Sequence, residues 1–297
     1  MIRVRPKISA FVVAYNRAHI LGTCLRALRF ADEVIVVDKS STDDTRAVAA
    51  RHATRVVTVP WTPTVEETRA YALSLCAHDW ILFLDDDECL SPAAPAFIRS
   101  RVARGTSDIY AFPLRHYILG VHDEAAYYWP EHHIRLFRRG AVSFSGTVHQ
   151  GVHARSERLT YIPPETGVCI HHLSHPDVAG WIERTNRYTS RPDRARPAEA
   201  GDDLAGFAHA RLHHWLSRTR DKTPGGYPEA AAVLRAVYDI VDRLKCWEET
   251  RGLDGHALFR EACERLDAAH LAYANRSLLR RLKDAWITRR ACRHRPG

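Results

Sequence analysis

Hydrophobic residues near the start of the chain fall into short continuous runs separated by mixed segments. The runs are rich in β-branched and aromatic residues, which predicts buried strands over Ile8–Tyr15, Glu33–Asp38, Arg55–Val59 and Trp80–Leu84. Between them, helical spacing of apolar residues predicts helices over Ile20–Leu28, from the capping run Ser40–Asp44 to about Arg51, and over Val65–Cys76. Apolar strands that alternate with helices indicate an α/β fold with a mostly parallel sheet and helices on both faces.

Polar residues stand where three of these strands end. Asn16 follows the first strand, Asp38 closes the second, and the acidic run Asp85–Glu88 follows the fourth. Ligands of parallel α/β sheets bind beyond the carboxyl ends of the strands. The sequence therefore predicts a binding site at this edge of the sheet.

The rest of the chain has a different pattern. Residues 105–175 mix short β-like runs, such as Asp108–Phe112 and Ile134–Phe137, with turns and histidines, which predicts further strands. Residues 176–206 are dense in Pro, Arg, Gly and Asp, which favours loop for part of the segment. After about residue 207 the pattern is helical, and the apolar stripe from Ala232 to Leu244 predicts a core-facing helix.

Composition narrows the class of protein. The 297 residues are 45% hydrophobic and 26% charged, which is typical of a globular chain with a sizeable core. Neither a membrane-spanning run nor a secretory signal is evident, so we expect a cytoplasmic protein. The seven cysteines include no Cys-x-x-Cys pair, which indicates reduced thiols. The net charge of +8 is concentrated after Arg276, and this arginine-rich tail is either a solvated end or a peripheral membrane contact, not a nucleic-acid platform.

The acidic run suggests metal chemistry. Four successive carboxylates repel one another, and a divalent cation is the simplest way to make the arrangement favourable. Mg²⁺ and Mn²⁺ prefer oxygen ligands and often share them with substrate phosphates. In an extended segment Asp85 and Asp87 point the same way, so they are expected to face one ligand.

Taken in order, several segments make the chain similar to a known family. They are Ser9–Asn16, Ala31–Asp38, Ser40–Thr45, His78–Glu88, Trp129–Gly140, Val148–Gln150, His172–Ser174, Asn186–Thr189 and Lys245–Glu248. The chain resembles the family 2 glycosyltransferases from Ile8 to about Glu248, and it looks most like the branch that includes lipopolysaccharide-core glucosyltransferases. No single segment is specific, but their order and spacing are.

The resemblance implies a GT-A fold, a nucleotide diphosphate sugar as donor, with a UDP-sugar favoured, and inversion at the anomeric carbon. It implies that Asp38 contacts the base or ribose and that Asp85 and Asp87 are the acids of an Asp-x-Asp motif. The residues expected to contact the donor are Ala14, Tyr15, Asn16, Asp38, Ser40, Arg69, Asp85, Asp86 and Arg135. The corresponding domains are a GT-A domain over 1–206, with a donor half to about 104 and an acceptor half from about 105, and a helical region over 207–297.

Three positions depart from the family pattern. Ala70 stands where relatives often have Asn, which removes a polar contact. Glu131 replaces a common Asp, so a longer acid occupies that position. Gln150 follows His149 where Glu is common, which removes a charge near the expected acceptor.

Displacement of a nucleoside diphosphate needs a cation at the leaving phosphate and a base at the attacking hydroxyl. The expected cofactor is Mn²⁺ or Mg²⁺, held by Asp87 and Asp85, with His172 as a further ligand or phosphate donor. Glu131 is the candidate base. Arg135 and Arg138 suit a diphosphate because a guanidinium matches phosphate geometry.

The expected partners are a nucleotide-sugar donor and a glycan, glycolipid or small-molecule acceptor. Three alternatives stay open: transfer to a polyprenyl phosphate, a nucleotidyltransferase, and a non-catalytic family member. The second is disfavoured because Ala14–Ala18 contains no glycine for a phosphate loop. The intact Asp85 and Asp87 pair disfavours the third.

Overall fold

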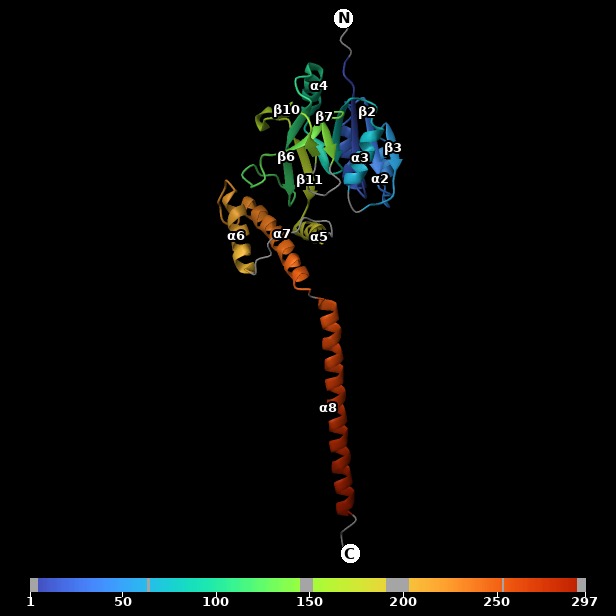
Figure 1. Ribbon diagram of the computed structural model, residues 1–297, viewed down its shortest axis with the longest axis vertical. Coiled ribbons are helices and arrows are strands. Elements are labelled where there is room, and N and C mark those ends of the chain that lie inside the picture. The colour runs from blue at the N-terminus through green and yellow to red at the C-terminus, as the bar shows by residue number, and fades with distance from the viewer. Residues whose placement is uncertain (1–4, 63–64, 145–151, 191–202, 253, 293–297) are drawn as a thin grey trace. The chain divides into compact units, whose positions relative to one another are not determined.

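The computed structural model describes residues 5–62, 65–144, 152–190, 203–252 and 254–292. Its first part alternates strands and helices as the apolar pattern predicts (Figure 1). The elements are β1 (Ile8–Ala14), α1 (Ala18–Ala27), β2 (Glu33–Asp38), α2 (Thr45–Ala50), β3 (Arg55–Thr58), α3 (Glu66–Leu75) and β4 (Trp80–Asp85). All four predicted strands are confirmed, with ends within one residue of the expected positions.

The following segment adds further strands to the same sheet. Its elements are β5 (Glu88–Leu90), α4 (Ala94–Arg104), β6 (Ile109–Ile118), β7 (Glu131–Arg138), β8 (Val142–Phe144), β9 (Val152–Ala154), β10 (Leu159–Tyr161), a 3₁₀ turn (Pro164–Thr166) and β11 (Ile170–His175). The expected boundaries of the strands after residue 105 were too short, because β6 and β7 extend past the apolar runs that indicated them.

Four helices follow: α5 (Val178–Thr189), α6 (Leu204–Ser217), α7 (Tyr227–Thr250) and α8 (Gly255–Cys292). Helix α5 lies within the segment whose composition favoured loop. The Asp177 side chain caps it by accepting a hydrogen bond from the Gly180 amide at 2.7 Å. The predicted helical pattern after residue 207 is confirmed. Val148, His149 and Gln150, which contributed to the resemblance, lie outside the described residues.

The main sheet has the strand order β3-β2-β1-β4-β7-β6-β11-β5, and β10 pairs with β6. β1 lies parallel to β2 and β4, whereas β7 runs antiparallel to both β4 and β6. In this register Ala14 pairs with Asp38 and Val13 pairs with Asp85. The polar ends of β1, β2 and β4 therefore meet at one edge, as the sequence predicts.

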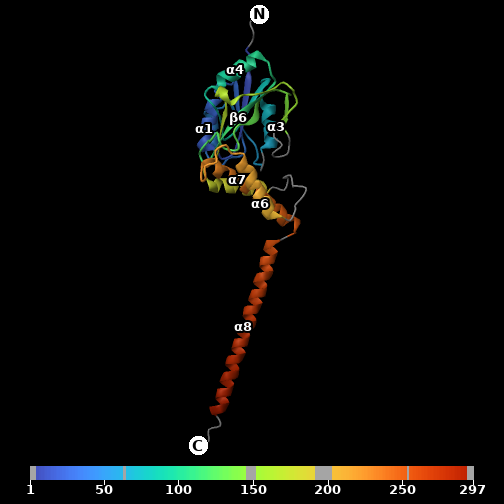
Figure 2. The ribbon, with the colours of Figure 1, turned by 90° about the vertical axis from the view of Figure 1, so that its left-hand side faces the viewer.

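Side-chain alternation in the strands gives the sheet a core on each face. On one face, Ala10 and Val12 of β1 pack with Leu21 of α1 and Ile98 of α4. On the other, Phe11 packs in a second cluster that includes Ala72 of α3 and Phe83 of β4. Figure 2 shows α1 and α3 on opposite sides of the sheet. This is the GT-A-type α/β architecture that the resemblance implies.

A third apolar cluster attaches the helices that follow the sheet. Ile118 at the end of β6 packs with Trp129, Trp181 of α5 and Leu234 of α7. The Trp181 indole N–H donates to the Leu234 carbonyl at 3.2 Å. The predicted core-facing stripe of α7 is buried at Ala232 and Ala236, but Val233 and Leu244 at its margins are exposed.

Contacts within the chain group residues 1–245 into one compact unit and residues 246–297 into a second. The boundary at residue 206 that the sequence suggests stays a prediction. Within the second unit, α8 is a single helix whose apolar side chains Leu258, Phe259, Leu266 and Leu271 are exposed. Among the described residues, no helix is long and apolar enough to cross a membrane. Cys24, Cys76, Cys89, Cys169, Cys246 and Cys263 are free thiols.

Candidate active site

The loops after β1 and β2 form the first wall of the site. Asn16 and Ser40, which follow these strands, both have left-handed backbone conformations, with φ of 52° and 59°. This conformation is uncommon outside glycine and marks positions that the surrounding structure holds in place. The Asn16 side chain accepts a hydrogen bond from the Thr42 amide at 2.8 Å, and the Ser40 hydroxyl donates to the Val59 carbonyl at 2.8 Å.

Asp38 lies fully buried at the end of β2. Its carboxylate accepts hydrogen bonds from the Ser41 amide at 3.2 and 3.3 Å, and Arg46 lies 3.8 Å away. Nearby, the rings of Tyr15 and Trp61 lie 6.1 Å apart and are both exposed. The predicted residues Ala14, Tyr15, Asn16, Asp38 and Ser40 are thus brought together at the ends of two adjacent strands.

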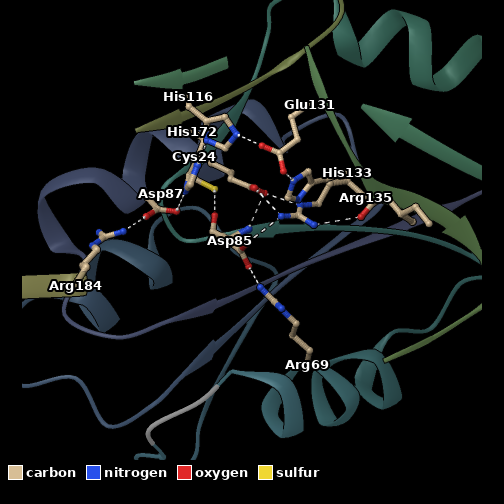
Figure 3. A network of polar contacts seen from close by, with 12 residues as sticks. Cys24, Arg69, Asp85, Asp87, His116, Glu131, His133, Arg135, His172 and Arg184 are labelled. Carbon is tan, nitrogen blue, oxygen red and sulfur yellow. Dashed lines mark hydrogen bonds and ion pairs between the residues drawn. The ribbon is translucent and has the colours of Figure 1, made fainter. Parts of the chain in front are cut away.

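The acidic run turns sharply after β4, so Asp85 and Asp87 contact different partners, and their sharing of one ligand stays a prediction. Strand β4 ends at Asp85, and Asp86 and Asp87 lie in a turn, so the alternation of an extended chain does not apply. Asp85 contacts Arg69 and lies 3.1 Å from Arg135. Figure 3 shows Asp85 between these two arginines and Asp87 on the other side of the turn, facing Arg184.

Arg135 is a buried structural cation. Its guanidinium donates two 2.7 Å hydrogen bonds to Glu88, lies 3.1 Å from Asp85 and stacks 4.6 Å above the Phe83 ring. Although burial opposes it, the adjacent Glu88 and Asp85 carboxylates raise the pKa of Arg135. A phosphate contact from Arg135 would require breaking these bonds. Arg138, at the far end of β7, instead pairs with Asp108 at 3.7 Å.

Asp86 and Asp87 have different electrostatic environments. Asp86 accepts from the Tyr15 amide at 3.3 Å and from Arg17 at 3.1 Å. Burial raises the pKa of Asp86 to about 6, against the opposing effect of Arg17. Burial would also raise the pKa of Asp87, but three nearby cationic groups lower it. They are His172 at 3.4 Å, Arg17 at 3.8 Å and Arg184 at 3.6 Å. Asp87 is therefore held as a carboxylate, as Asp85 is by Arg69 and Arg135, and its partners His172 and Arg184 line the cavity described below.

A chain of contacts runs from Asp87 to Glu131. The His172 Nε2 atom lies 3.4 Å from Asp87, and its Nδ1 lies 2.8 Å from Nδ1 of His116. The His116 Nε2 atom lies 3.2 Å from Glu131, whose other oxygen is 3.0 Å from His133 (Figure 3). Hydrogen bonds from His116 and His133 lower the pKa of Glu131, so it is a carboxylate at neutral pH. Burial would lower the pKa of His172, but Asp87 raises it.

Sequence reasoning missed Arg17, His116 and Arg184. Arg17 immediately precedes α1. His116 lies in the part of β6 beyond the predicted strand, and Arg184 lies on α5, in a segment for which the sequence favoured loop. None stands in a short motif. Arg184 lies two residues before the matching segment Asn186–Thr189, which was the one local signal available for it.

The described residues include no group of three or more His, Cys, Asp or Glu side chains arranged to hold a metal ion. Two side chains are placed to act together as metal ligands: an oxygen of Asp87 lies close to Nε2 of His172. The other ring nitrogen of His172 contacts His116. Metal-ligating histidines usually use the second ring nitrogen in this way. The pair fits a divalent cation that completes its coordination with substrate phosphates and water. Asp85 fits less well, because Arg69 and Arg135 engage its oxygens.

His116, Glu131 and His172 line a cavity of about 870 Å³ within the first unit. The other lining residues come from the ends of β6 and β11, the loop before β7, α5, α6 with the residue after it, and α7. This volume is within the usual range for small-molecule sites, roughly 300–1,000 Å³.

Comparison with known proteins agrees with this geometry. Residues 9–156 match the model of the family described as Glycosyl transferase family 2. An uncharacterized glycosyltransferase of Rickettsia felis is 34% identical over 151 residues, which cover 50% of this chain and 53% of that protein. The lipopolysaccharide core biosynthesis glycosyltransferase LpsC of Rhizobium meliloti is 28% identical over 162 residues, covering 50% and 58%. The chain thus spans about half the length of the curated relatives it matches.

Solved structures give weaker likenesses. TarS of S. aureus has a TM-score of 0.43 at 16% identity, covering 80% of this chain and 49% of that one. Glucosyl-3-phosphoglycerate synthase from Mycobacterium tuberculosis, in a complex with Mn²⁺, UDP and glucosyl-3-phosphoglycerate, has a TM-score of 0.31 at 24% identity, covering 37% and 44%. TM-scores this low carry no inference about substrate. Through the match of residues 9–156, which contain the strand ends and the acidic run described above, the chain belongs to glycosyl transferase family 2.

Proposed function

We propose that the protein is an inverting glycosyltransferase that moves a sugar from a nucleotide diphosphate sugar, preferably a UDP-sugar, to a hydroxyl group of an acceptor in the cavity. The contact chain Asp87–His172–His116–Glu131 carries this proposal, because it connects a cation-binding pair to a carboxylate that faces the cavity. Membership of the family supports the reaction class.

The donor binds at the ends of β1, β2 and β4. Asp38 and the backbone around Tyr15 and Asn16 hold the nucleoside, consistent with the register that pairs Ala14 with Asp38. The ion pairs of Asp85 with Arg69 and Arg135, and of Asp86 with Arg17, fix the floor of the site. Asp87 and His172 would hold a divalent cation, Mn²⁺ or Mg²⁺, and such an ion neutralises charge on a leaving diphosphate.

Glu131 acts as the base on the acceptor side. It takes the proton of the acceptor hydroxyl as that oxygen forms a bond to the anomeric carbon. The bond from the anomeric carbon to the diphosphate oxygen breaks, and the nucleoside diphosphate leaves with the electron pair. Hydrogen bonds to His116 and His133 keep Glu131 ionised and oriented before the acceptor arrives.

Thermal unfolding with UDP, GDP, ADP, CMP and dTDP, each with and without Mn²⁺, tests the donor site. A ligand at about 100 times its dissociation constant adds roughly 2.7 kcal/mol of stability, which raises the melting temperature by about 4 °C for a chain of this size. We expect a rise with one nucleotide, dependent on the metal, that disappears in Asp87→Ala and persists in Asp79→Ala, a matched change of an exposed aspartate. No rise with any nucleotide would favour the non-catalytic alternative.

A further inference from the structure

Of the residues proposed to hold the cation or to act as the base, His172 and Glu131 line the cavity, and those proposed to hold the nucleoside do not. A further set of lining residues comes from α6, from the position just after it and from α7, and we call it the α6–α7 end of the cavity: Trp215, Arg218, Arg235, Tyr238 and Asp239. All of these residues belong to the first compact unit. Nothing in the donor chemistry requires this end, so its side chains point to a separate ligand.

Trp215 forms a fixed aromatic surface at this end. Its indole N–H donates to Asp239 at 2.6 Å, and the Tyr127 ring lies 4.9 Å from its own ring. These contacts orient the indole without covering it fully. A rigid aromatic face with polar groups around it is a surface on which the apolar face of a sugar ring packs.

Three arginines surround the same indole. The guanidinium groups of Arg211, Arg235 and Arg218 lie 5.3, 5.0 and 5.6 Å from the Trp215 ring. Arg211 and Arg235 both pair with Asp239, at 2.6 and 3.3 Å.

Arg218 is different. It is exposed, and within the described ranges no carboxylate lies at ion-pairing distance from it. Arg211 and Arg235 thus share Asp239, whereas Arg218 lines the cavity with its charge unpaired among the described residues, 5.6 Å from the Trp215 ring.

We propose that the α6–α7 end of the cavity binds a saccharide acceptor that carries an anionic group, either a carboxylate or a phosphate. A sugar ring packs on Trp215, and the anionic group pairs with Arg218, whose planar guanidinium matches both anions in a bidentate manner. The inference rests on the proposed glycosyltransferase function, and it deepens that function by giving the acceptor a charge and a position.

Isothermal titration of the intact chain, with and without UDP and Mn²⁺, tests this inference. The probes are a neutral glucose disaccharide, the same disaccharide with one glucuronic acid, glucose 6-phosphate and inorganic phosphate. The variants are Arg218→Gln and Trp215→Phe, with Arg51→Gln as a matched change of an exposed arginine outside the cavity. The charged sugar that binds with the higher affinity identifies the anionic group as a carboxylate or a phosphate.

We expect a charged sugar to bind more tightly than the neutral disaccharide and than inorganic phosphate. Arg218→Gln should weaken the charged sugar by about tenfold or more, the loss expected for a charge-assisted hydrogen bond, and should change the neutral disaccharide by less than about twofold. Arg51→Gln should change neither. Trp215→Phe should keep most of the affinity, because a ring remains.

Equal affinity for charged and neutral sugars, no effect of Arg218→Gln, or binding of inorganic phosphate as tight as that of the sugars would each overturn the inference. These outcomes are separable from failure of the proposed function. If nucleotide binding is intact but no charged sugar binds, only the acceptor inference fails. If a charged sugar binds through Arg218 but no nucleotide does, the donor site and the transferase function fail instead.

Discussion

The four acids from the end of β4 to the start of β5 have four different sets of partners. Asp85 contacts Arg69 and Arg135, Asp86 contacts Arg17, Asp87 contacts His172, and Glu88 contacts Arg135. Cationic side chains from distant segments therefore supply much of the charge that the acidic run needs. These ion pairs stabilise the run in addition to the cation that we propose at Asp87 and His172.

Replacement of Glu131 by Gln tests its role as base. Gln keeps the shape and the hydrogen-bonding capacity but cannot accept the proton, so we expect release of nucleoside diphosphate from the donor to slow by about 10²-fold or more. Nucleotide affinity should be unchanged, because Glu131 lies on the acceptor side. Steady-state kinetics and a nucleotide titration measure the two quantities. The control is Glu124→Gln, which changes an exposed acid paired with Arg115 at 2.8 Å and should leave the rate unchanged. If Glu131→Gln also leaves the rate unchanged, Glu131 is not the base.

Asp32 gives a pH dependence that is independent of the site. Burial would raise the pKa of Asp32, but hydrogen bonds from Arg99 at 2.8 Å, the Ile8 amide at 2.9 Å and Arg5 at 2.7 Å lower it. A carboxylate with a lowered pKa in the folded state contributes stability that is present above its unfolded pKa, about 3.9, and is lost as the pH falls toward the folded value.

We therefore expect the free energy of unfolding of the wild-type protein to fall more steeply between about pH 5 and about pH 3 than that of Asp32→Asn. Urea unfolding at several pH values measures this difference. Glu157→Gln, at an exposed acid, should keep the wild-type slope. Parallel curves for wild type and Asp32→Asn would show that the Asp32 contacts do not stabilise the fold.

Three strands are tied together by one buried ion-pair cluster. Arg135 of β7 reaches Asp85 at the end of β4 and Glu88 at the start of β5. β4 and β7 are antiparallel neighbours, whereas β5 pairs with β11 and not with either of them. The cluster therefore links β5 to β4 and β7 through side chains, whereas backbone pairing holds β5 to β11.

Arg135→Leu should destabilise the protein by about 3–5 kcal/mol, because Glu88 is left buried without its cation. Arg138→Leu, on the same strand, removes an exposed pair with Asp108 and should cost at most about 1 kcal/mol. Urea unfolding compares the two. The double variant Arg135→Leu/Glu88→Leu should recover part of the loss, since no unpaired charge remains at Glu88. Equal effects of the two single variants would argue against a buried cluster.

The molecule is organised as two compact units with different internal packing. The first contains both faces of the sheet, the third apolar cluster and the cavity, whereas α8 in the second leaves its described apolar side chains exposed. This difference predicts that the donor site and its stability belong to the first unit alone.

A chain that ends at Thr250, after α7, should keep the nucleotide-dependent thermal shift and a melting temperature within about 3 °C of the full chain. A chain that ends at Thr223 loses α7, and with it the bond from Trp181 to Leu234 and part of the third cluster. It should therefore melt clearly lower. The idea is contradicted if the chain that ends at Thr250 loses the shift, since α8 would then be required for binding.

The sequence by itself determined the features that depend on local periodicity. The strands β1 to β4, the helices between them and the polar residues at the strand ends follow from apolar runs a few residues long. Because parallel strands bring their carboxyl ends to one edge, these runs also predicted the meeting of Asp38 with the acidic run. The order and spacing of the matching segments indicated the resemblance to the family 2 glycosyltransferases.

Only the tertiary structure decided which side chains the acids meet and where the cavity lies. His116 and His172 are 56 positions apart, and Arg135 and Glu88 are 47 apart, so no local pattern reveals either contact. The turn at Asp86–Asp87 separated two acids that an extended chain would have aligned. Helix α5 was missed because composition obscured its Asp177 cap, and without α5 the Arg184 contact and the cavity wall could not be foreseen. Such contacts depend on how elements that are distant in sequence pack, which short-range hydrophobic spacing does not determine.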